Sequence, residues 1–231
     1  MSYECERCKD VGFIFTKNER GFDVAEPCSC QEIKRLKTRM MNSGIHEKDL
    51  KKGFNDFETF EEQSLKNVKN MGISYFSNFE DIKNSDENSL LLSGPSGRGK
   101  TTLALAVANN LMKNKNEAVL YLNYREQITY LKQVVNDQEK YGLAMERYKK
   151  ANILFIDDLF KGKLTESDIN IAYEIINFRC LKRLPMIITT QRSLDELMDF
   201  DDAIGGRIIE RSMIAVFDEA IPNFRLRKGA C

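Results

Sequence analysis

Between an apolar run and a run of helix-forming residues, the chain reads Gly94-Pro95-Ser96-Gly97-Arg98-Gly99-Lys100-Thr101. This stretch matches the phosphate-loop pattern G-x-x-x-x-G-K-[ST] in full. Glycine residues allow the backbone N–H groups of such a loop to turn toward phosphate oxygens, and the start of the following helix adds a positive dipole end. The pattern therefore predicts a site for the phosphates of a nucleotide, provided that a strand precedes the loop and a helix follows it.

The polar residues of the loop have expected roles. Lys100 is expected to reach the β- and γ-phosphates of ATP, and the hydroxyl of Thr101 is expected to bind Mg²⁺. We include Thr102, the next residue along the chain, among those that contact the nucleotide. The alternative is a glycine-rich turn that matches the pattern by chance, and the sequence on both sides of the loop argues against it.

On both sides of the loop, short apolar runs alternate with longer helical patterns. The expected strands are 89–93, 118–122, 153–156, 186–189 and 214–217. Helical patterns cover 101–112, continue from the second strand to about 150, and begin again at the capping signals 165–168 and 193–196. Continuous apolar strands that are separated by helices favour a parallel sheet with both faces covered. We therefore expect a doubly wound α/β domain.

Two acidic residues, Asp157 and Asp158, directly follow the apolar run 153–156. A phosphate loop works with an acid near the metal, ordinarily at the end of an apolar strand. We expect Asp157 to contact Mg²⁺ directly or through water, and Asp158 to orient the water that attacks the γ-phosphate. Paired acids are also common in turns and helix caps, but their combination with Lys100 favours the catalytic interpretation.

With these two motifs, the sequence from about Phe54 to Arg227 resembles the AAA+ ATPases, in particular the DnaC/DnaI-type replicative helicase loaders and their IstB-like relatives. The resemblance depends on an ordered set of short segments and not on the phosphate loop alone. These segments are residues 89–94, Asp157-Asp158-Leu159, Ile175-Ile176-Asn177-Phe178-Arg179, residues 186–191, Gly206-Arg207-Ile208-Ile209-Glu210-Arg211 and Asn223-Phe224-Arg225. The resemblance implies the AAA+ fold and the cofactors ATP and Mg²⁺.

The resemblance also implies a role for the residues that follow the fourth strand. The strand that ends at Thr189 is similar to the sensor 1 strand, whose terminal polar residue helps to position the hydrolytic water. The loaders usually have Thr-Ser-Asn there, whereas this chain has Thr189-Thr190-Gln191. Gln191 is one methylene longer than asparagine, but it can still donate and accept hydrogen bonds.

Basic residues near the end of the chain are similar to those that complete an ATP site in the family. Arg211, or as a second choice Arg207, resembles the arginine that reaches the ATP of the neighbouring subunit, because a planar guanidinium spreads charge over a transferring phosphoryl group. The alternative for both is a salt-bridged surface with Glu210 or Asp202. Arg225 resembles the sensor 2 arginine, with a solvated basic tail as its alternative.

The cysteines at the start of the chain form two close pairs, Cys5-x-x-Cys8 and Cys28-x-Cys30, separated by 19 residues. Four thiolates suit a tetrahedral Zn²⁺ ion. A segment with so few apolar side chains needs a cross-link such as a bound metal ion to fold. The segment also resembles the N-terminal zinc module of the DnaI-type loaders, which implies contact with the helicase. A redox pair or four inert thiols is the alternative.

The chain has 35 Lys+Arg and 35 Asp+Glu among 231 residues, so its formal net charge is zero. This balance excludes a protein that holds nucleic acid or an anionic membrane by bulk charge alone. Contact with single-stranded DNA would need cationic side chains at specific positions. Candidates are Lys161, Lys163 and the basic residues at 147–150. The alternative for these residues is a solvated loop.

The expected location is the cytoplasm. No apolar run approaches the roughly 20 residues needed to span a bilayer, and the start of the chain is too polar and acidic for a secretory signal. A reducing compartment agrees with clustered cysteines that do not resemble a disulfide scaffold. We interpret the remaining two cysteines, Cys180 and Cys231, as a core residue and part of a tail.

The expected organisation has three parts. Residues 1–45 would form a zinc-binding module that contacts the helicase, residues 46–88 a helical connection, and residues 89–231 an AAA+ ATPase domain. The expected function is ATP-dependent loading of a hexameric replicative helicase onto single-stranded DNA, with weak DNA contact that ATP modulates and self-association through the ATP site. The alternatives are an IstB-like transposition helper ATPase and a non-hydrolysing ATP switch.

Overall fold

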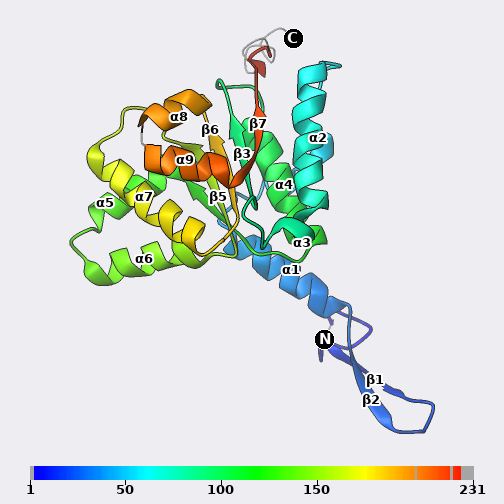
Figure 1. Ribbon diagram of the computed structural model, residues 1–231. Helices are drawn as coiled ribbons and strands as arrows, with labels where there is room; N and C mark the ends of the chain where they lie inside the picture. The colour runs from blue at the N-terminus through cyan, green and yellow to red at the C-terminus, as the bar shows by residue number, and fades with distance from the viewer. Residues whose placement is uncertain (1–2, 201, 219–220, 225–231) are drawn as a thin grey trace. The chain divides into compact units, whose positions relative to one another are not determined.

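The computed structural model describes residues 3–200, 202–218 and 221–224. The chain divides into two compact units, Met1–Asn42 and Ser43–Cys231, whose elements are labelled in Figure 1. Arg225, which the sequence assigns to the ATP site, lies outside the described residues, and so does Cys231.

The N-terminal unit is a hairpin followed by a helix. β1 (Phe13–Lys17) pairs antiparallel with β2 (Asp23–Pro27), and α1 (Cys30–Asn42) follows. The hairpin is almost entirely exposed, and the buried side chains among the described residues of this unit are those of Cys8, Cys28 and Cys30. β2 was not expected, because its acidic residues and its proline disfavour a strand.

Among the described residues of the second unit, five strands form a parallel sheet in the order β4-β5-β6-β3-β7. The strands are β3 (Ser89–Ser93), β4 (Val119–Asn123), β5 (Ile153–Leu159), β6 (Met186–Thr190) and β7 (Ser212–Val216). Each corresponds to an expected apolar run, and the expected doubly wound α/β fold is confirmed. Because the strands are parallel, the residues that follow β3, β5 and β6 meet at one edge of the sheet.

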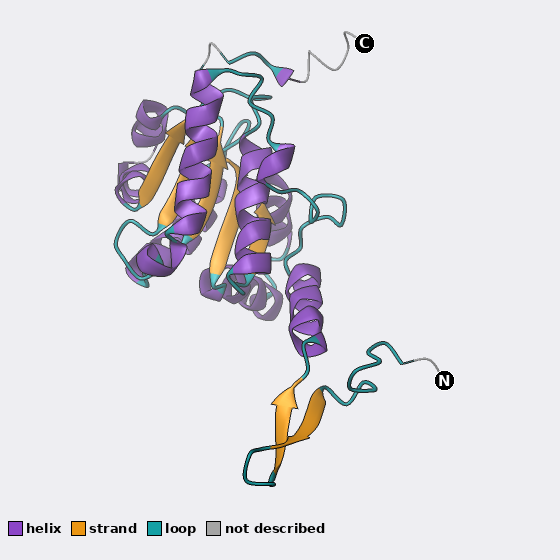
Figure 2. Ribbon diagram, turned by 90° about the vertical axis from the view of Figure 1, so that its right-hand side faces the viewer, coloured by secondary structure: helices purple, strands orange, loops and turns teal. Residues whose placement is uncertain are grey.

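Helices cover both faces of this sheet (Figures 1 and 2). One face carries α2 and α4, and the other carries α5, α7 and α9, with α6 packed on α7 and α8 on α9. The helices are α2 (Gln63–Ser77), α3 (Phe79–Ile82), α4 (Lys100–Asn114), α5 (Tyr124–Gln133), α6 (Gln138–Lys150), α7 (Glu166–Leu181), α8 (Leu194–Phe200) and α9 (Asp202–Glu210), with a 3-10 turn, η1 (Phe54–Asp56). Within the described ranges, none of these helices combines the length and apolar character needed to cross a membrane.

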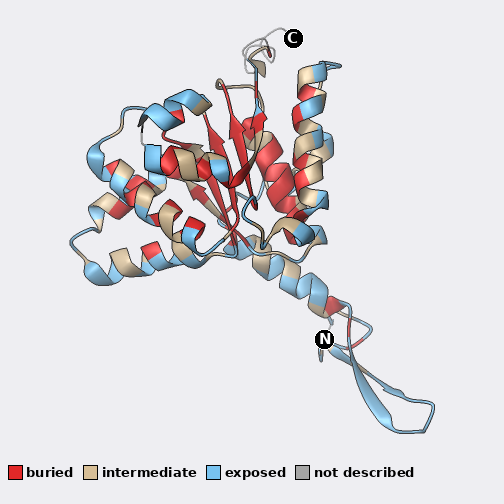
Figure 3. Cartoon of the chain, in the orientation of Figure 1, coloured by how far each residue is buried: buried red, intermediate tan, exposed pale blue. Residues whose placement is uncertain are grey.

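The strands of the sheet form the centre of the core, as Figure 3 shows by their burial. Successive side chains of a strand point to opposite faces. Leu91 and Ile188 therefore pack with the cluster that includes α5, α7 and α9, and their neighbours Leu90 and Ile187 turn to the face that α4 covers. Burial on both faces explains why these strands are continuously apolar and not alternating.

The segment between α1 and β3, which we expected to be a connection, is packed into the second unit. Phe57 is 3% exposed, and its ring meets that of Phe217 edge-on at 6.3 Å. The amide of Asn109 in α4 donates to the carbonyl oxygens of Asp49 and Lys52, at 2.7 and 2.8 Å. The aromatic residues of this segment thus cover α4 and lie beside the end of β7.

The expected capping signals are confirmed. At the start of α7, Asp168 accepts from the backbone N–H of Thr165 at 2.7 Å, and the Thr165 hydroxyl accepts from that of Asp168. Before α8, Glu196 and Ser193 exchange the same two bonds at 2.7 and 3.1 Å. Both caps satisfy N–H groups that a helix start leaves without partners, which fixes where each helix begins.

Arg179 of α7 is fully buried and ties three segments together. Its guanidinium donates to the carbonyl oxygens of Tyr148, Lys149 and Ala151 at the end of α6, and to that of Pro185 before β6, at 2.8–3.1 Å. The last turn of a helix leaves carbonyl groups without partners. A cation there donates hydrogen bonds to these groups and is also attracted by the negative end of the helix dipole. Burial lowers the pKa of Arg179 to about 9, so the side chain stays charged at neutral pH.

We predict that Arg179→Met lowers the free energy of unfolding by about 3 kcal/mol, because several buried carbonyl groups lose their donor at once. Urea denaturation followed by circular dichroism measures this change. Arg147→Met is the matched control, because Arg147 is an exposed residue in the last turn of α6, where a change below about 0.5 kcal/mol is expected. Equal losses in the two variants would contradict the role given to Arg179.

Candidate nucleotide site and cysteine cluster

The phosphate loop follows β3 directly, and α4 begins at Lys100. Gly94 and Gly97 have φ angles of 134° and 79°. A Cβ atom on Gly94 would lie 2.3 Å from the carbonyl oxygen of Phe217, and one on Gly97 would lie 2.0 Å from Oδ1 of Asn223. Only glycine fits these two positions. The strand, loop and helix that the motif requires are therefore present.

Lys100 lies inside the loop. Its ammonium group donates to the carbonyl oxygens of Gly94 at 2.5 Å and Pro95 at 2.7 Å, and only 5% of the residue is exposed. Burial lowers the pKa of Lys100 to about 8. A phosphate anion beside this partly desolvated cation would offset that cost, because it favours the charged form. At the rim of the loop, Arg98 donates to the carbonyl oxygen of Ser96 at 3.0 Å.

The carboxylate of Asp157, at the end of β5, accepts hydrogen bonds from hydroxyl groups of different elements. Thr101 of α4 and Thr189 of β6 donate to Oδ1 at 2.9 and 2.6 Å, and Tyr121 of β4 donates to Oδ2 at 3.1 Å. Burial raises the pKa of Asp157, and the hydroxyl donors act against this rise. The carboxylate and the Thr101 hydroxyl are oxygen ligands of the kind that Mg²⁺ prefers.

Asp158 is held by its backbone and by its side chain. Its φ angle is 57°, in the left-handed region, and its N–H donates to the Thr189 hydroxyl at 2.8 Å. The pairing of β5 with β6 shifts register at this point, which turns the carboxylate out of the strand. Gln191 Nε2 donates to Oδ1 at 3.2 Å, and Lys161 Nζ lies 2.6 Å from Oδ2.

A pocket of about 360 Å³ opens beside the loop. It is lined by acidic residues, by a group of aromatic residues that we call the aromatic wall, and by residues of the loop and the start of α4. The acidic residues are Asp56, Glu58 and Asp158, and the loop and helix residues are Ser96, Gly97, Gly99, Lys100, Thr101 and Thr102. The aromatic residues are Phe57, Phe60 and Phe224, and the rings of Phe60 and Phe224 stack at 4.9 Å between centroids. Flat aromatic faces beside a phosphate site suit the base of a nucleotide.

The structure thus brings together most of the residues that the sequence assigned to the ATP site. The loop residues, Thr102, Asp157, Asp158 and Gln191 meet at the carboxyl edge of the sheet. The sequence interpretation missed Tyr121 and the aromatic wall. Their signals were a tyrosine within the second expected strand, the aromatic residues between 54 and 79, and the Asn223-Phe224 segment.

Arg211 lies at the opposite edge of the sheet from the phosphate loop of its own chain. It directly precedes β7, which runs parallel to β3, and its carbonyl oxygen accepts from the N–H of Ser89 at 3.0 Å. The loop follows the other end of β3. A strand of this length separates the two positions by roughly 15 Å, so Arg211 is remote from its own phosphate loop.

The surroundings of the two candidate finger arginines differ. Arg211 is 9% exposed and lies 3.6 Å from a carboxylate oxygen of Asp86, and its Nε and Nη2 atoms have no hydrogen-bond partner within the described part of the chain. Arg207 donates to Asn177 and to the hydroxyl of Tyr173. Arg211 therefore retains unused donors, whereas Arg207 is engaged within its own chain.

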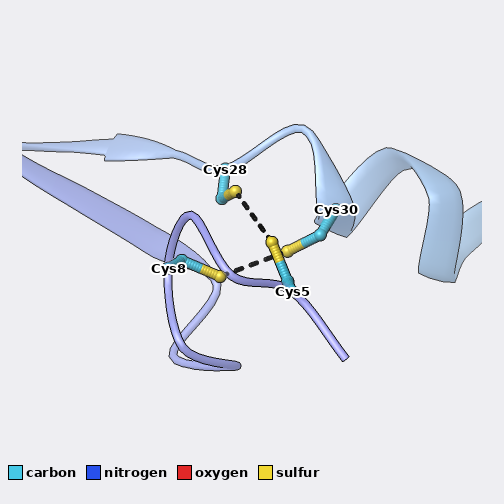
Figure 4. A group of neighbouring side chains, drawn as sticks. All are labelled: Cys5, Cys8, Cys28 and Cys30. Atoms are coloured by element: carbon cyan, nitrogen blue, oxygen red, sulfur yellow. Dashed lines mark hydrogen bonds between the residues drawn. The ribbon is translucent and has the colours of Figure 1, made fainter. Parts of the chain in front are cut away.

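The four N-terminal cysteines converge, as Figure 4 shows. Cys5 and Cys8 come from the loop before β1, Cys28 follows β2, and Cys30 begins α1. Their sulfur atoms lie within 4.8 Å of one another, with Cys5–Cys28 and Cys8–Cys30 separations of 3.7 and 3.4 Å. Tetrahedral Zn²⁺ with Zn–S bonds of about 2.3 Å places its sulfur ligands about 3.8 Å apart. The cluster therefore has the donor set and spacing of a zinc site.

Hydrogen bonds within the cluster distribute its protons unevenly. The backbone N–H of Cys8 lowers the pKa of the Cys5 thiol to about 7, whereas the bond with the Cys8 side chain raises that of Cys30 to about 12. The N–H of Gly12 also donates to the Cys8 sulfur at 3.3 Å. Donors to sulfur of this kind support thiolate ligands.

The sheet order, the loop after β3 and the acids at the end of β5 define a phosphate-loop nucleotide-binding protein with the AAA+ fold. Residues 26–214 match the family of IstB-like ATP binding proteins, and the chain belongs to this family. The parallel α/β fold and the family that the sequence suggested are both confirmed.

The similarities to individual proteins agree with this assignment. The chain is 34% identical over 214 residues to the phage-like element PBSX protein XkdC of Bacillus subtilis (strain 168), covering 90% of this chain and 79% of that protein. The solved structure of the DnaC helicase loader has a TM-score of 0.65 at 19% identity, covering 75% of this chain and 100% of that chain. The corresponding values for DnaI are 0.64, 20%, 76% and 95%. The two structural similarities show a shared fold.

We predict that Tyr121→Phe raises the Mg²⁺ concentration needed for half-maximal binding of a fluorescent ATP analogue by about fivefold, because the Asp157 carboxylate loses one hydroxyl donor. Tyr124→Phe is the matched control, since the Tyr124 hydroxyl faces the carbonyl oxygen of Asp168 instead. An unchanged Mg²⁺ dependence for Tyr121→Phe would show that this hydroxyl does not position Asp157 for binding the metal.

We predict that the purified protein contains about one equivalent of zinc by elemental analysis and that Cys28→Ser removes most of it, because tetrahedral Zn²⁺ needs all four ligands. Cys180→Ser is the control, because Cys180 is buried in α7, outside the cluster, and its substitution should leave the metal content unchanged. A zinc content well below one equivalent in the wild-type protein would exclude the metal site.

Proposed function

We propose that this protein is a Mg²⁺-dependent ATPase that loads a hexameric replicative DNA helicase onto single-stranded DNA. The ATPase part rests on the convergence of three groups at the phosphate loop. These are the ammonium group of Lys100, the hydroxyl of Thr101 at the start of α4 and the carboxylate of Asp157 at the end of β5. Membership in an ATP-binding family supports the choice of nucleotide.

The phosphate loop would hold the phosphates of ATP through its backbone N–H groups and Lys100. Thr101 and Asp157 would hold Mg²⁺, which when bound neutralises the charge on the β- and γ-phosphate oxygens. The aromatic wall formed by Phe57, Phe60 and Phe224 would contact the base. In this assignment the loop residues contact the phosphates and the aromatic wall contacts the base.

Asp158 would act as the proton acceptor in hydrolysis. The oxygen of a water molecule forms a bond with the γ-phosphorus while the bond from that phosphorus to ADP breaks, and the water proton passes to the Asp158 carboxylate. Gln191 reaches this carboxylate at 3.2 Å. The extra methylene of glutamine therefore does not prevent contact with the acid, which supports a sensor role for Gln191 and favours an enzyme over a non-hydrolysing switch.

The position of Arg211 supports self-association through the ATP site. It lies at the opposite edge of the sheet from the loop of its own chain, and it lines a pocket together with Asp86 and Arg207. Its buried Nε and Nη2 atoms have no hydrogen-bond partner among the described residues. In a ring or filament of subunits, that edge would face the phosphate loop of a neighbour. Arg211 would then complete the neighbour's site during hydrolysis.

The helicase-loading part of the proposal rests on the N-terminal unit and on structural similarity. The fold of the second unit is shared with solved structures of the DnaC helicase loader and DnaI. The four cysteines belong to a compact unit of their own, Met1–Asn42, whereas the phosphate loop belongs to the second unit. Such a division suits a module that holds a partner protein. An IstB-like transposition helper is the second candidate, because the family that the chain matches carries that name.

Affinity isolation with a non-hydrolysable ATP analogue separates these two candidates. We expect the tagged protein to retain a hexameric replicative helicase, and we expect Cys8→Ser with Cys28→Ser to lose it while ATP hydrolysis continues. The purified helicase should then be retained on circular single-stranded DNA only when the loader and ATP are present. Retention of a transposase instead of a helicase would overturn the loader and favour the transposition helper.

We predict that Arg211→Ala keeps ATP binding but reduces hydrolysis by about a thousandfold, because the finger acts only in the transition state. Lys100→Ala should lose ATP binding. Mixtures of the two variants should recover part of the activity, because a Lys100→Ala subunit still supplies an intact finger to its neighbour. Steady-state phosphate release across mixing ratios measures this effect, and no recovery at any ratio would contradict a finger that acts between subunits.

A further inference from the structure

The acid proposed to accept the proton of water is paired with a lysine of its own chain. Lys161 Nζ lies 2.6 Å from Oδ2 of Asp158, while Gln191 occupies Oδ1. Both carboxylate oxygens are thus engaged by donors. A carboxylate that accepts a proton from water must turn an oxygen toward that water. The ion pair with Lys161 therefore competes directly with the catalytic position of Asp158.

Lys161 stands where the chain passes from the core to an exposed loop. The preceding Phe160 is 1% exposed, and its ring meets that of Tyr124 edge-on at 5.6 Å. The side chain of Lys161 is 37% exposed, and Gly162 and Lys163 after it are exposed. The ammonium group of Lys161 is therefore accessible to solvent, while the packing of Phe160 holds the preceding backbone in place.

Cations lie on this loop and beside it. Arg192 donates to the carbonyl oxygen of Gly162 at 3.5 Å, which brings its guanidinium beside the loop that holds Lys161 and Lys163. Glu196 lies 3.6 Å from the Arg192 guanidinium. Gly162 has a φ angle of 91°, so the turn depends on glycine. The chain has no net charge, so binding of a nucleic acid depends on local groups of cations such as this one, which can contact backbone phosphates.

We propose that Lys161 is a phosphate-responsive latch on Asp158. In the absence of nucleic acid, its ammonium group holds the carboxylate away from the attacking water. A backbone phosphate of single-stranded DNA on the loop Lys161–Lys163 draws the ammonium away, and Asp158 turns to the nucleotide. This inference rests on the proposed ATPase function and goes beyond it, because it names the residue through which DNA binding would set the hydrolysis rate.

Steady-state ATP hydrolysis with and without an oligo-dT strand tests the latch. In the wild type, the strand should raise the rate. Lys161→Met should raise the rate without DNA by about two- to fivefold, the range expected for a partly exposed ion pair, and the strand should no longer raise it. Lys163→Met is a second variant of the proposed DNA-binding loop, since it removes a neighbouring cation and leaves the ion pair intact. It should still be stimulated by the strand but need more DNA for full stimulation.

A basal rate of Lys161→Met at or below that of the wild type, or unchanged stimulation by oligo-dT, would overturn the latch. A wild-type rate that does not respond to oligo-dT would overturn it as well. A raised KM for ATP without a raised basal rate would show that Lys161 instead contacts the phosphates of ATP, which is also incompatible with the proposal. The absence of a helicase partner would contradict the loader function but not the latch. The hydrolysis measurements need no helicase, so they test the latch independently.

Discussion

The buried carboxylate of Asp157 is the point on which the nucleotide site depends. A buried carboxylate is costly unless hydrogen-bond donors surround it, and here the donors are hydroxyl groups of Thr101, Thr189 and Tyr121. Each donor belongs to a different element, so the contacts require β4, β5 and β6 in adjacent positions and α4 directly after the phosphate loop. The same contacts that stabilise the acid therefore fix the positions of the two proposed metal ligands, Thr101 and Asp157.

Thr189 extends this arrangement from the metal ligand to the proposed proton acceptor. Its hydroxyl donates to Asp157 and accepts from the N–H of Asp158. A single side chain of β6 thus holds two successive acids in different conformations, one inside the strand and one turned out of it. The proposed metal ligand and the proposed proton acceptor are therefore both hydrogen-bonded to one residue.

The sequence predicts those parts of this account that depend on local pattern. The phosphate loop, the acids after an apolar run and the capping signals each require only a few neighbouring residues, and the structure places them as expected. Tyr121 and the aromatic wall depend on strand register and on contacts between distant segments, which local pattern does not contain. Strand β2 was missed because its partner and the cysteine cluster stabilise it more than its own residues do.

The central claim is that Thr101 and Asp157 form the Mg²⁺ end of an ATP site whose phosphates are held by Lys100. The most direct measurement is an experimental structure of the protein with a non-hydrolysable ATP analogue and Mg²⁺. The account predicts the metal bound to the Thr101 hydroxyl, with Asp157 in direct or water-mediated contact and the Lys100 ammonium moved from the loop carbonyl groups to the phosphates. A bound nucleotide with the hydrogen bond between Thr101 and Asp157 unbroken, and the metal held by other residues, would contradict it.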